Sequence, residues 1–276
     1  MADLIFDIGM HNGDDTAYYL ASGYDVVAVE ANPEFCAAAR ERSAAEIAAG
    51  RLTICNVGIA EQAGELEFWV SERSEWSSFH KEIATRAGVS ASPIVVPTMR
   101  LADLLNNYPA ALCVKIDIEG NDSLCIRELE RSSSLPAYVS FELSTYAAFG
   151  GNDAAADIQF LAKLGYQGFK CIRQNDWREI TPDNMQWQGR MRKILAKAGS
   201  HGVVLGVLLR HLHYRRTRTN GRRFAVGSSG PLAREFPGRW MTCEETLAVF
   251  ENLRALDREL DAGGLGEWFD IHAARR

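Results

Sequence analysis

Three common features are missing from this sequence. No apolar stretch approaches the ~20 residues that a bilayer-spanning helix needs, so no transmembrane segment is expected. The six cysteines form no Cys-x-x-Cys pair and most lie in apolar surroundings, so we expect reduced, buried thiols. Because the first predicted strand already begins near residue 3, we expect no signal peptide before it. The location expected from these absences is the cytoplasm.

The dinucleotide fingerprint Gly-x-Gly-x-x-Gly is also absent, which disfavours a nucleotide-dependent oxidoreductase. A net charge of −6 argues against general nucleic-acid binding, since nucleic-acid-binding proteins neutralise phosphates with basic side chains. The apolar fraction of 47% and the charged fraction of 24% are ordinary for a soluble globular protein. We therefore expect one domain over residues 1–276, a length that can bury a large core.

A glycine-bearing turn follows the first apolar run. Leu4-Ile-Phe6 leads into Asp7-Ile-Gly-Met-His-Asn-Gly13, and the next apolar run ends on Glu30. Glycine lets backbone approach a ligand closely, because it tolerates positive φ and has no Cβ. An acid that ends the second strand can accept hydrogen bonds from ribose hydroxyls. Since Asp7 replaces the first fingerprint glycine, the turn suits a cationic, amino-acid-bearing ligand such as S-adenosylmethionine better than a pyrophosphate.

Strand-like and helix-like segments alternate over the first 175 residues, which predicts a Rossmann-like α/β fold. We expect a seven-stranded, mostly parallel sheet. The predicted strands are 3–8, 25–30, 51–57, 112–118, 137–143, 166–173 and 223–227, with an extra pairing strand at 65–70. The predicted helices are 14–22, 34–49, 100–107, 121–131 and 153–164. A last helix is expected to begin at the capping box Thr242-x-x-Glu245.

The carboxyl ends of several predicted strands should meet at one edge of the sheet, where open α/β sheets bind ligands. Asp117 and Glu119 lie at one of these ends, and in an extended chain they would face the same side. Buried acids are rare unless paired, which favours a functional role. The structural alternative is that Lys115 pairs with one acid while Glu119 caps the following helix.

Two motifs carry a family resemblance. Asp7, Gly9 and Gly13 form an Asp-x-Gly-x-x-x-Gly pattern, and residues 115–120 read Lys-x-Asp-x-Glu-Gly. In these motifs the chain resembles an FkbM-type S-adenosylmethionine-dependent methyltransferase. The resemblance covers roughly residues 3–175 and 223–255, and it extends to three shorter stretches: Glu75-Trp-Ser-Ser78, Thr98-x-x-Leu101 and Ser229-Gly-Pro231. The chain departs from the family pattern at His11, at Asp122 and in the basic segment 185–223.

The resemblance implies a class I methyltransferase architecture and transfer of a methyl group to a hydroxyl of a sugar or glycan, a polyketide or a similar metabolite. Asp7 and the Gly9–Gly13 backbone would hold the methionine end, Glu30 the ribose, and Asn56 with Val57 the adenine edge. His11 would contact the cofactor or the acceptor, or only line the turn. The full cofactor-binding set implied is Asp7, Gly9, His11, Asn12, Gly13, Glu30, Ala31, Asn56, Val57 and Asp117.

Four residues are candidates for the base that accepts the hydroxyl proton. Asp117 and Glu119 are expected nearest the methyl site, followed by Glu142, while a lone loop histidine such as His80 is more often only solvated. Two acids that share a site raise the pKa of one of them, which helps it accept a proton near neutrality. The same two acids could bind Mg²⁺ instead, although the sequence does not require a metal ion.

The segment 185–223 contains ten Lys or Arg residues and no Asp or Glu. We consider three hypotheses for it. It could be part of a helical insertion, residues 177–222, that lies over the acceptor pocket. It could lie on an anionic membrane surface, which would make the protein peripheral to the membrane. It could also bind an anionic substrate or a partner protein.

Two other functions stay open beside methyl transfer. One is a nucleotide-dependent oxidoreductase on a Rossmann-like fold, which the turn sequence disfavours. The other is a non-catalytic, methyltransferase-like domain that binds a ligand or partner without turnover. The intact motif residues disfavour a loss of catalytic activity of this kind. The expected partner is a small-molecule or glycan acceptor, with no nucleic acid, and no oligomeric state is predicted.

Overall fold

A computed structural model describes residues 3–143, 154–200, 228–259 and 268–275. The chain divides into two compact units. The first contains the chain up to Phe141, so it includes most of the strand 138–143, and the second contains Glu142 and everything from Ala154 to Ala274. Each unit is described by itself below.

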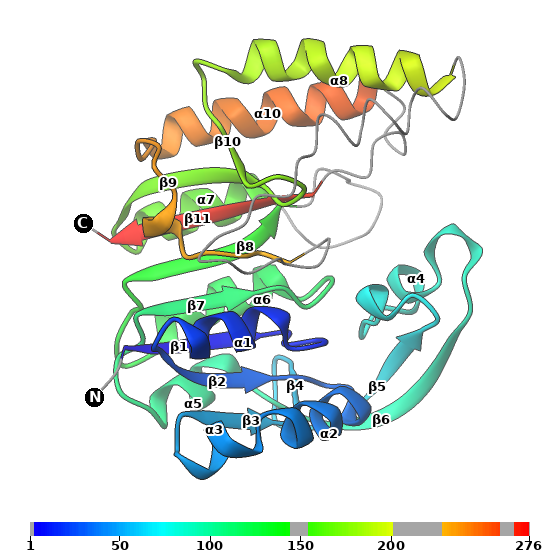
Figure 1. Cartoon of the computed structure of the whole chain (residues 1–276), viewed down its shortest axis with the longest axis vertical. Coiled ribbons are helices and arrows are strands. Elements are labelled where there is room, and N and C mark those ends of the chain that lie inside the picture. The colour runs from blue at the N-terminus through cyan, green and yellow to red at the C-terminus, as the bar shows by residue number, and fades with distance from the viewer. Residues whose placement is uncertain (1–2, 144–153, 201–227, 260–267, 276) are drawn as a thin grey trace. The chain divides into compact units, whose positions relative to one another are not determined.

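Five parallel strands form the sheet of the first unit in the order β8-β7-β1-β2-β3, and Figure 1 shows them in blue to green. Their bounds are β1 Leu4–Ile8, β2 Asp25–Val29, β3 Leu52–Cys55, β7 Cys113–Ile116 and β8 Tyr138–Leu143. β1, β2 and β7 are almost continuous runs of buried apolar residues. Such runs are typical of parallel strands covered on both faces. The five predicted strands at these places are confirmed.

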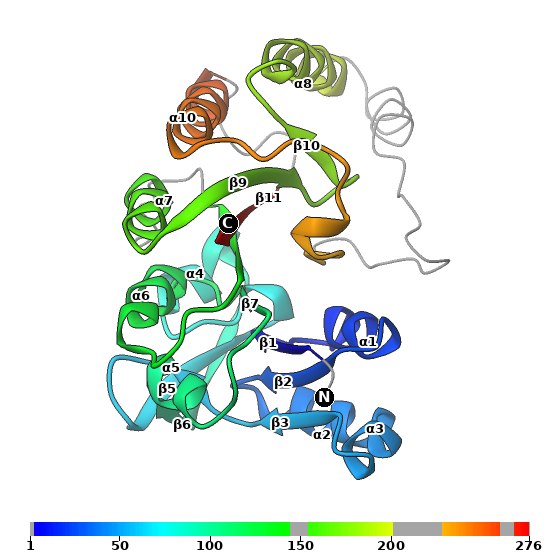
Figure 2. The same ribbon diagram turned by 90° about the vertical axis from the view of Figure 1, so that its left-hand side faces the viewer.

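Helices cover both faces of this sheet. Figure 2 shows α1 and α3 on one side of the strands and α5 and α6 on the other. The helices are α1 Asp14–Ala21, α2 Pro33–Arg42, α3 Ala44–Ala48, α5 Leu101–Asn106, α6 Asp122–Glu128 and the short η3 Leu129–Arg131. The single helix predicted over 34–49 is wrong, because the backbone leaves helical geometry at Ser43 (φ −112°, ψ 30°) and two helices form.

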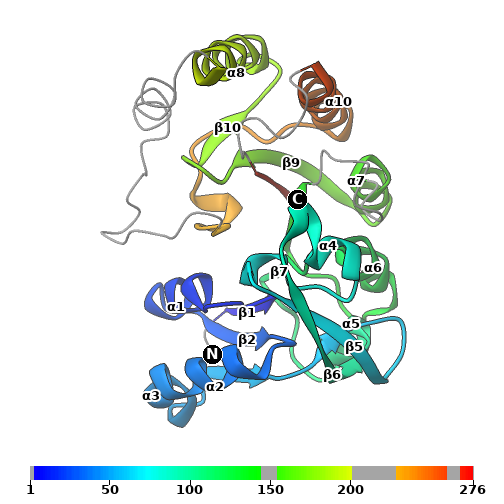
Figure 3. The same ribbon diagram turned by 90° about the vertical axis from the view of Figure 1, so that its right-hand side faces the viewer.

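A second, smaller sheet in the first unit has the order β4-β6-β5, with β5 and β6 side by side in Figure 3. The strands are β4 Gly58–Ile59, β5 Gly64–Ser71 and β6 Ala91–Met99. β5 confirms the extra strand predicted at 65–70. The chain between β5 and β6, residues 72–90, contains η1 Ser74–Trp76, α4 Lys81–Ala84 and η2 Arg86–Gly88. We call it the 72–90 segment, and it contacts the candidate functional site.

Among its described residues the second unit has three strands, in the order β10-β9-β11. They are β9 Tyr166–Arg173, β10 Arg178–Ile180 and β11 Phe269–Arg275. Neither β10 nor β11 was predicted, and with them the described strands outside the small β4-β6-β5 sheet number eight rather than seven. The predicted strand 223–227 lies outside the described residues. Arg173 is fully buried here and holds both carboxylate oxygens of Asp176, at 2.8 and 2.5 Å.

The helices described in the second unit are α7 Ala154–Lys163, α8 Met185–Ser200, η5 Ala233–Glu235 and α10 Cys243–Glu259. The predicted capping box starts α10: the Glu245 amide donates to Thr242 Oγ1 and the Thr242 amide donates to Glu245 Oε2. Phe250 and Leu253 on its apolar face are buried. α8 confirms helix in the first part of the basic segment, whose residues 201–223 lie outside the described ranges. No helix in those ranges has the length and apolarity to cross a bilayer.

Candidate functional site

The turn after β1 depends on positive φ at three positions, Gly9 (88°), His11 (49°) and Gly13 (79°). The amides of Gly9 and Met10 both donate to Val29 O, at 3.0 and 2.9 Å, which ties the turn to the end of β2. On the other side the turn meets the loop after β7, because a Cβ placed on Gly9 would lie 1.8 Å from Asp117 O. The ends of β1, β2 and β7 therefore meet as predicted, and only glycine fits at position 9.

Glu30 ends β2 and is buried, yet its carboxylate is well supplied with donors. Oε2 accepts the His11 amide and Oε1 accepts the Asn32 amide, each at 2.8 Å. Burial raises the pKa of Glu30, and these two backbone hydrogen bonds oppose that shift. Since a carboxylate has about four acceptor positions, about two remain for a ligand.

The segment after Glu30 is fixed by Asn56. Its Nδ2 donates to the carbonyl oxygens of Glu30 and Ala31, at 2.9 and 3.0 Å. Val57 is half-buried beside it, directly after β3. Asn12, at the surface of the glycine turn, exchanges hydrogen bonds with Asp14. The structure thus brings together the residues that the sequence assigned to the ribose and adenine end.

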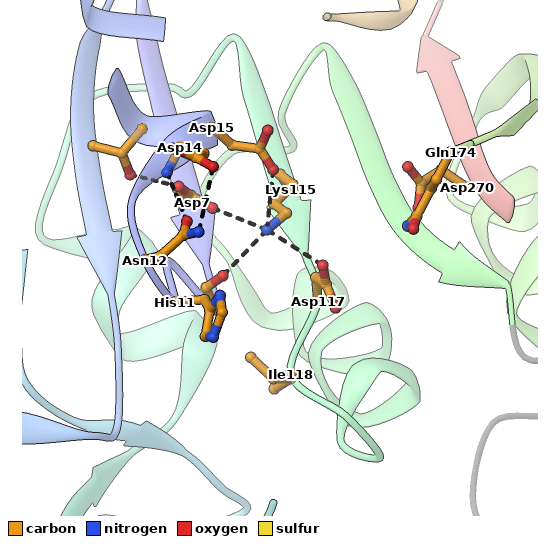
Figure 4. Close-up of polar contacts among 12 residues, drawn as sticks. Asp7, His11, Asn12, Asp14, Asp15, Lys115, Asp117, Ile118, Gln174 and Asp270 are labelled. Atoms are coloured by element: carbon orange, nitrogen blue, oxygen red, sulfur yellow. Dashed lines mark hydrogen bonds and ion pairs between the residues drawn. The ribbon is translucent and has the colours of Figure 1, made fainter. Parts of the chain in front are cut away.

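Lys115 lies where the ends of β1 and β7 meet. Its Nζ donates to Gly9 O at 3.1 Å and lies 3.3 to 3.7 Å from a carboxylate oxygen of each of three aspartates. Figure 4 shows these contacts radiating from the ammonium to the acids, which are Asp7, Asp15 and Asp117. Burial disfavours the charged amine, but the three carboxylates hold the pKa of Lys115 well above its usual value. We call these four side chains the Lys115 cluster.

The position of Asp7 differs from the sequence expectation. Asp7 is fully buried, and its Oδ2 accepts Thr16 Oγ1 at 2.5 Å while Oδ1 faces Lys115. Its carboxylate therefore supports the turn from the inside rather than presenting itself at the surface. The magnesium hypothesis concerned Asp117 and Glu119, and each of these two acids faces a different cation, Lys115 and Arg86. Among the residues that the structure describes, no group of three or more His, Cys, Asp or Glu could hold a metal ion.

Asp117 and Glu119 have different partners. The chain is not extended between them, since Glu119 has φ +49°. Asp117 faces Lys115, whereas the Glu119 carboxylate binds both terminal nitrogens of Arg86, at 2.9 and 3.1 Å. The structural alternative is thus right that Lys115 pairs with one acid, Asp117, and wrong that Glu119 caps the next helix, whose N-cap position is Asn121. Burial raises the pKa of Glu119 to about 7, with Arg86 opposing the shift.

The 72–90 segment contacts both loops of the site. His11 Nε2 lies 2.9 Å from Ser74 Oγ, and Ser78 Oγ donates to Glu119 O at 2.6 Å. His80 Nε2 lies 3.0 Å from Asn121 Oδ1, just beyond the Lys-x-Asp-x-Glu-Gly motif. Neither Ser74 nor Arg86 was predicted to have a role, and the only sequence signal near them is the family-like stretch 75–78. Glu142, the remaining candidate, is half-buried in β8 and falls within the second unit.

A family model, the methyltransferase FkbM domain, matches residues 7–167. That range is more than half of the chain and contains both motifs. The chain belongs to the FkbM methyltransferase family. Membership in this family supports methyl transfer from S-adenosylmethionine as the general activity, and it confirms the resemblance seen in the sequence. No curated protein matches the chain.

Solved structures similar to this FkbM family member are distant in sequence. The methyltransferase FkbM from Methylobacillus flagellatus is 13% identical with a TM-score of 0.35, and the match covers 51% of this chain and 32% of that protein. An S-adenosylhomocysteine complex of a methyltransferase from Thiobacillus denitrificans is 12% identical, with a TM-score of 0.38 and coverage of 100% and 86%. A similar complex from Geobacter sulfurreducens is 10% identical, with a TM-score of 0.38 and coverage of 100% and 85%.

Proposed function

We propose that this protein is an S-adenosylmethionine-dependent O-methyltransferase that acts on a hydroxyl of a sugar or glycan, a polyketide or a similar metabolite. The observation that supports it best is the Glu30 carboxylate, which two backbone amides hold at the end of β2 beside a glycine turn. This arrangement suits a ribose diol, because the carboxylate keeps acceptor positions for two hydroxyls. Family membership supplies the reaction class, and the hydroxyl acceptor is the finer part of the proposal.

The donor site that we propose consists of residues of the first unit. The glycine turn would receive the methionine end, Glu30 and Ala31 the ribose, and Asn56 with Val57 the adenine edge. When bound, the donor supplies a methyl group activated by a sulfonium. The protein's contribution is then to hold the acceptor oxygen in line with that methyl group, a proximity effect worth up to ~7–11 kcal/mol.

Glu119 is the base that we favour among the candidates. Its pKa of about 7 matches a proton acceptor that works near neutral pH. Arg86 occupies part of its carboxylate, but further lone pairs remain. Asp117 already faces the Lys115 ammonium at 3.5 Å, so part of its carboxylate is occupied. His80 and Glu142 stay as the other candidates.

This assignment predicts a pH dependence. The base must be ionised, so kcat should rise with pH through about 7 in the natural protein. Arg86→Met removes the cation that holds the pKa of Glu119 down, so the rise should move to higher pH. Glu119→Gln should lower kcat by about 10²–10⁴-fold at pH 8 while S-adenosylhomocysteine still binds. A Glu119→Gln variant with the kcat and pH profile of the natural protein would exclude Glu119 as the base.

The function itself is tested by incubating the protein with methyl-labelled S-adenosylmethionine and fractionated cell extract. We expect the label in a product that carries a new methyl ether. We also expect S-adenosylhomocysteine, but not NAD, to stabilise the protein against thermal unfolding. Label on nitrogen, sulfur or carbon would contradict the hydroxyl acceptor. Stabilisation by NAD alone would favour the oxidoreductase. Binding of S-adenosylhomocysteine without transfer to any fraction would favour the non-catalytic domain.

We also propose that residues 1–276 act as one methyltransferase domain, with 177–222 as an insertion. The family match supports this, because it begins at residue 7 in the first unit and continues to residue 167 in the second.

For the basic segment 185–223 we propose that it contacts an anionic membrane surface. The exposed Trp187 and Ile194 on α8 support it, since they lie close in sequence to Arg190 and Lys193. Failure to co-sediment with anionic liposomes at low salt would contradict it.

A further inference from the structure

The Lys115 cluster contains more negative than positive charge. One ammonium faces the carboxylates of Asp7, Asp15 and Asp117, at 3.3, 3.7 and 3.5 Å. Asp15 lies in the first turn of α1, where the helix dipole favours an acid and offsets part of its charge. Lys115 can neutralise only one of the other two. A negative charge is therefore left over at the point where the ends of β1 and β7 meet.

The members of the cluster differ in how far they reach the surface. The side chains of Asp7, Asp15 and Lys115 are 0%, 7% and 4% exposed, whereas that of Asp117 is 21% exposed. Asp117 is thus the member through which the surplus charge can act on a bound molecule. Its carbonyl oxygen is also the group that excludes a Cβ at position 9, so Asp117 adjoins the glycine turn directly.

Lys115 contacts both the glycine turn and the Asp117 carboxylate. The same Nζ donates to Gly9 O in the turn and approaches Asp117 Oδ2. Because the ammonium is buried, its three donors have little water to bind and are directed to protein oxygens. Removing it would release the turn and the Asp117 carboxylate together.

We propose that Lys115 is a positioning residue and that the surplus charge presented by Asp117 makes the donor site selective for a sulfonium over a neutral thioether. This inference rests on the proposed function. During transfer the carbon–sulfur bond breaks, its electron pair stays on sulfur, the methyl group bonds to the acceptor oxygen, and the hydroxyl proton goes to the base. The sulfur thereby loses its positive charge. A site that attracts that charge binds the product less tightly than the donor, which favours product release.

The test compares Kd values for S-adenosylmethionine and S-adenosylhomocysteine by calorimetry, because the two ligands differ only in the sulfonium methyl and its charge. Asp117→Asn should weaken S-adenosylmethionine binding by about tenfold and S-adenosylhomocysteine binding by less than about threefold. Asp25→Asn is the matched control, since Asp25 begins β2 at the opposite edge of the sheet and pairs with Arg51. It should change neither Kd.

Lys115→Met should weaken both ligands, because it releases the turn, and it should weaken S-adenosylhomocysteine at least as much as S-adenosylmethionine, because it removes a positive charge and no acid. If Lys115→Met does not fold, the Asp117→Asn comparison still tests whether the donor site is selective for the sulfonium. Equal loss of both ligands in Asp117→Asn, or an unchanged ratio of the two Kd values, would overturn the inference and leave the proposed function intact. If the natural protein binds neither ligand, the proposed function fails, and this inference fails with it.

Discussion

Alanine at position 9 is expected to abolish S-adenosylhomocysteine binding and to lower the free energy of unfolding by about 3–4 kcal/mol. Gly9 has φ +88°, a conformation that costs any residue with a Cβ about 1–2 kcal/mol. The added Cβ would also lie 1.8 Å from Asp117 O, a backbone atom that cannot rotate away. The turn and the loop after β7 must then separate, and the hydrogen bond from Lys115 to Gly9 O must lengthen or break.

Gly23→Ala is the matched control, because Gly23 shares the positive φ (94°) but has no atom within 4 Å of an added Cβ. It should lose only the conformational cost, about 1–2 kcal/mol, and keep S-adenosylhomocysteine binding. Urea unfolding and calorimetry measure the two effects. If Gly9→Ala and Gly23→Ala behaved alike, the close approach of the two loops would not be what the donor site depends on.

Glu30→Gln is expected to weaken S-adenosylhomocysteine binding by about 10–100-fold. The two oxygens of Glu30 accept the amides of His11 and Asn32, and a glutamine has only one oxygen. One amide would therefore face an NH₂ group, which costs about 1–3 kcal/mol for an unsatisfied buried donor. The ribose hydroxyls would also lose a charged acceptor.

Glu34→Gln makes the same chemical change on the exposed surface of α2, four residues further along the chain. It should leave the Kd for S-adenosylhomocysteine within about twofold of the natural value, since surface substitutions are usually worth less than ~0.5 kcal/mol. Calorimetry on the two variants gives the comparison. Natural affinity in Glu30→Gln would mean that this carboxylate does not bind the ligand.

Most of the architecture could be predicted from local sequence patterns. Alternating apolar runs and helical segments determine β1, β2, β7, β8 and β9, and the capping box marks the start of α10. β6 was missed because Pro93 and Pro97 interrupt it, and proline lacks the amide that a strand ladder uses. β11 was missed because its Asp270 and His272, polar residues that are buried in the structure, interrupt the apolar pattern.

The site was predicted in its members more than in their roles. Strand ends can be placed from sequence, so the meeting of Gly9, Glu30 and Asp117 was foreseen. The depth of Asp7 and the contact of Lys115 with a carbonyl 106 residues away depend on how β1 and β7 pair, which no local pattern encodes. Arg86 was missed for the same reason, because it reaches Glu119 across 33 residues from a short helical turn.

A crystal structure with S-adenosylhomocysteine bound is the most direct measurement of the donor site. We expect ribose hydroxyl oxygens within ~2.5–3.0 Å of the Glu30 carboxylate, and the amino-acid end of the ligand against the turn from Gly9 to Gly13. Asp117 should lie nearer to the sulfur than Asp7 or Asp15. A ligand bound elsewhere, or one whose ribose makes no hydrogen bond to Glu30, would contradict the donor site described here.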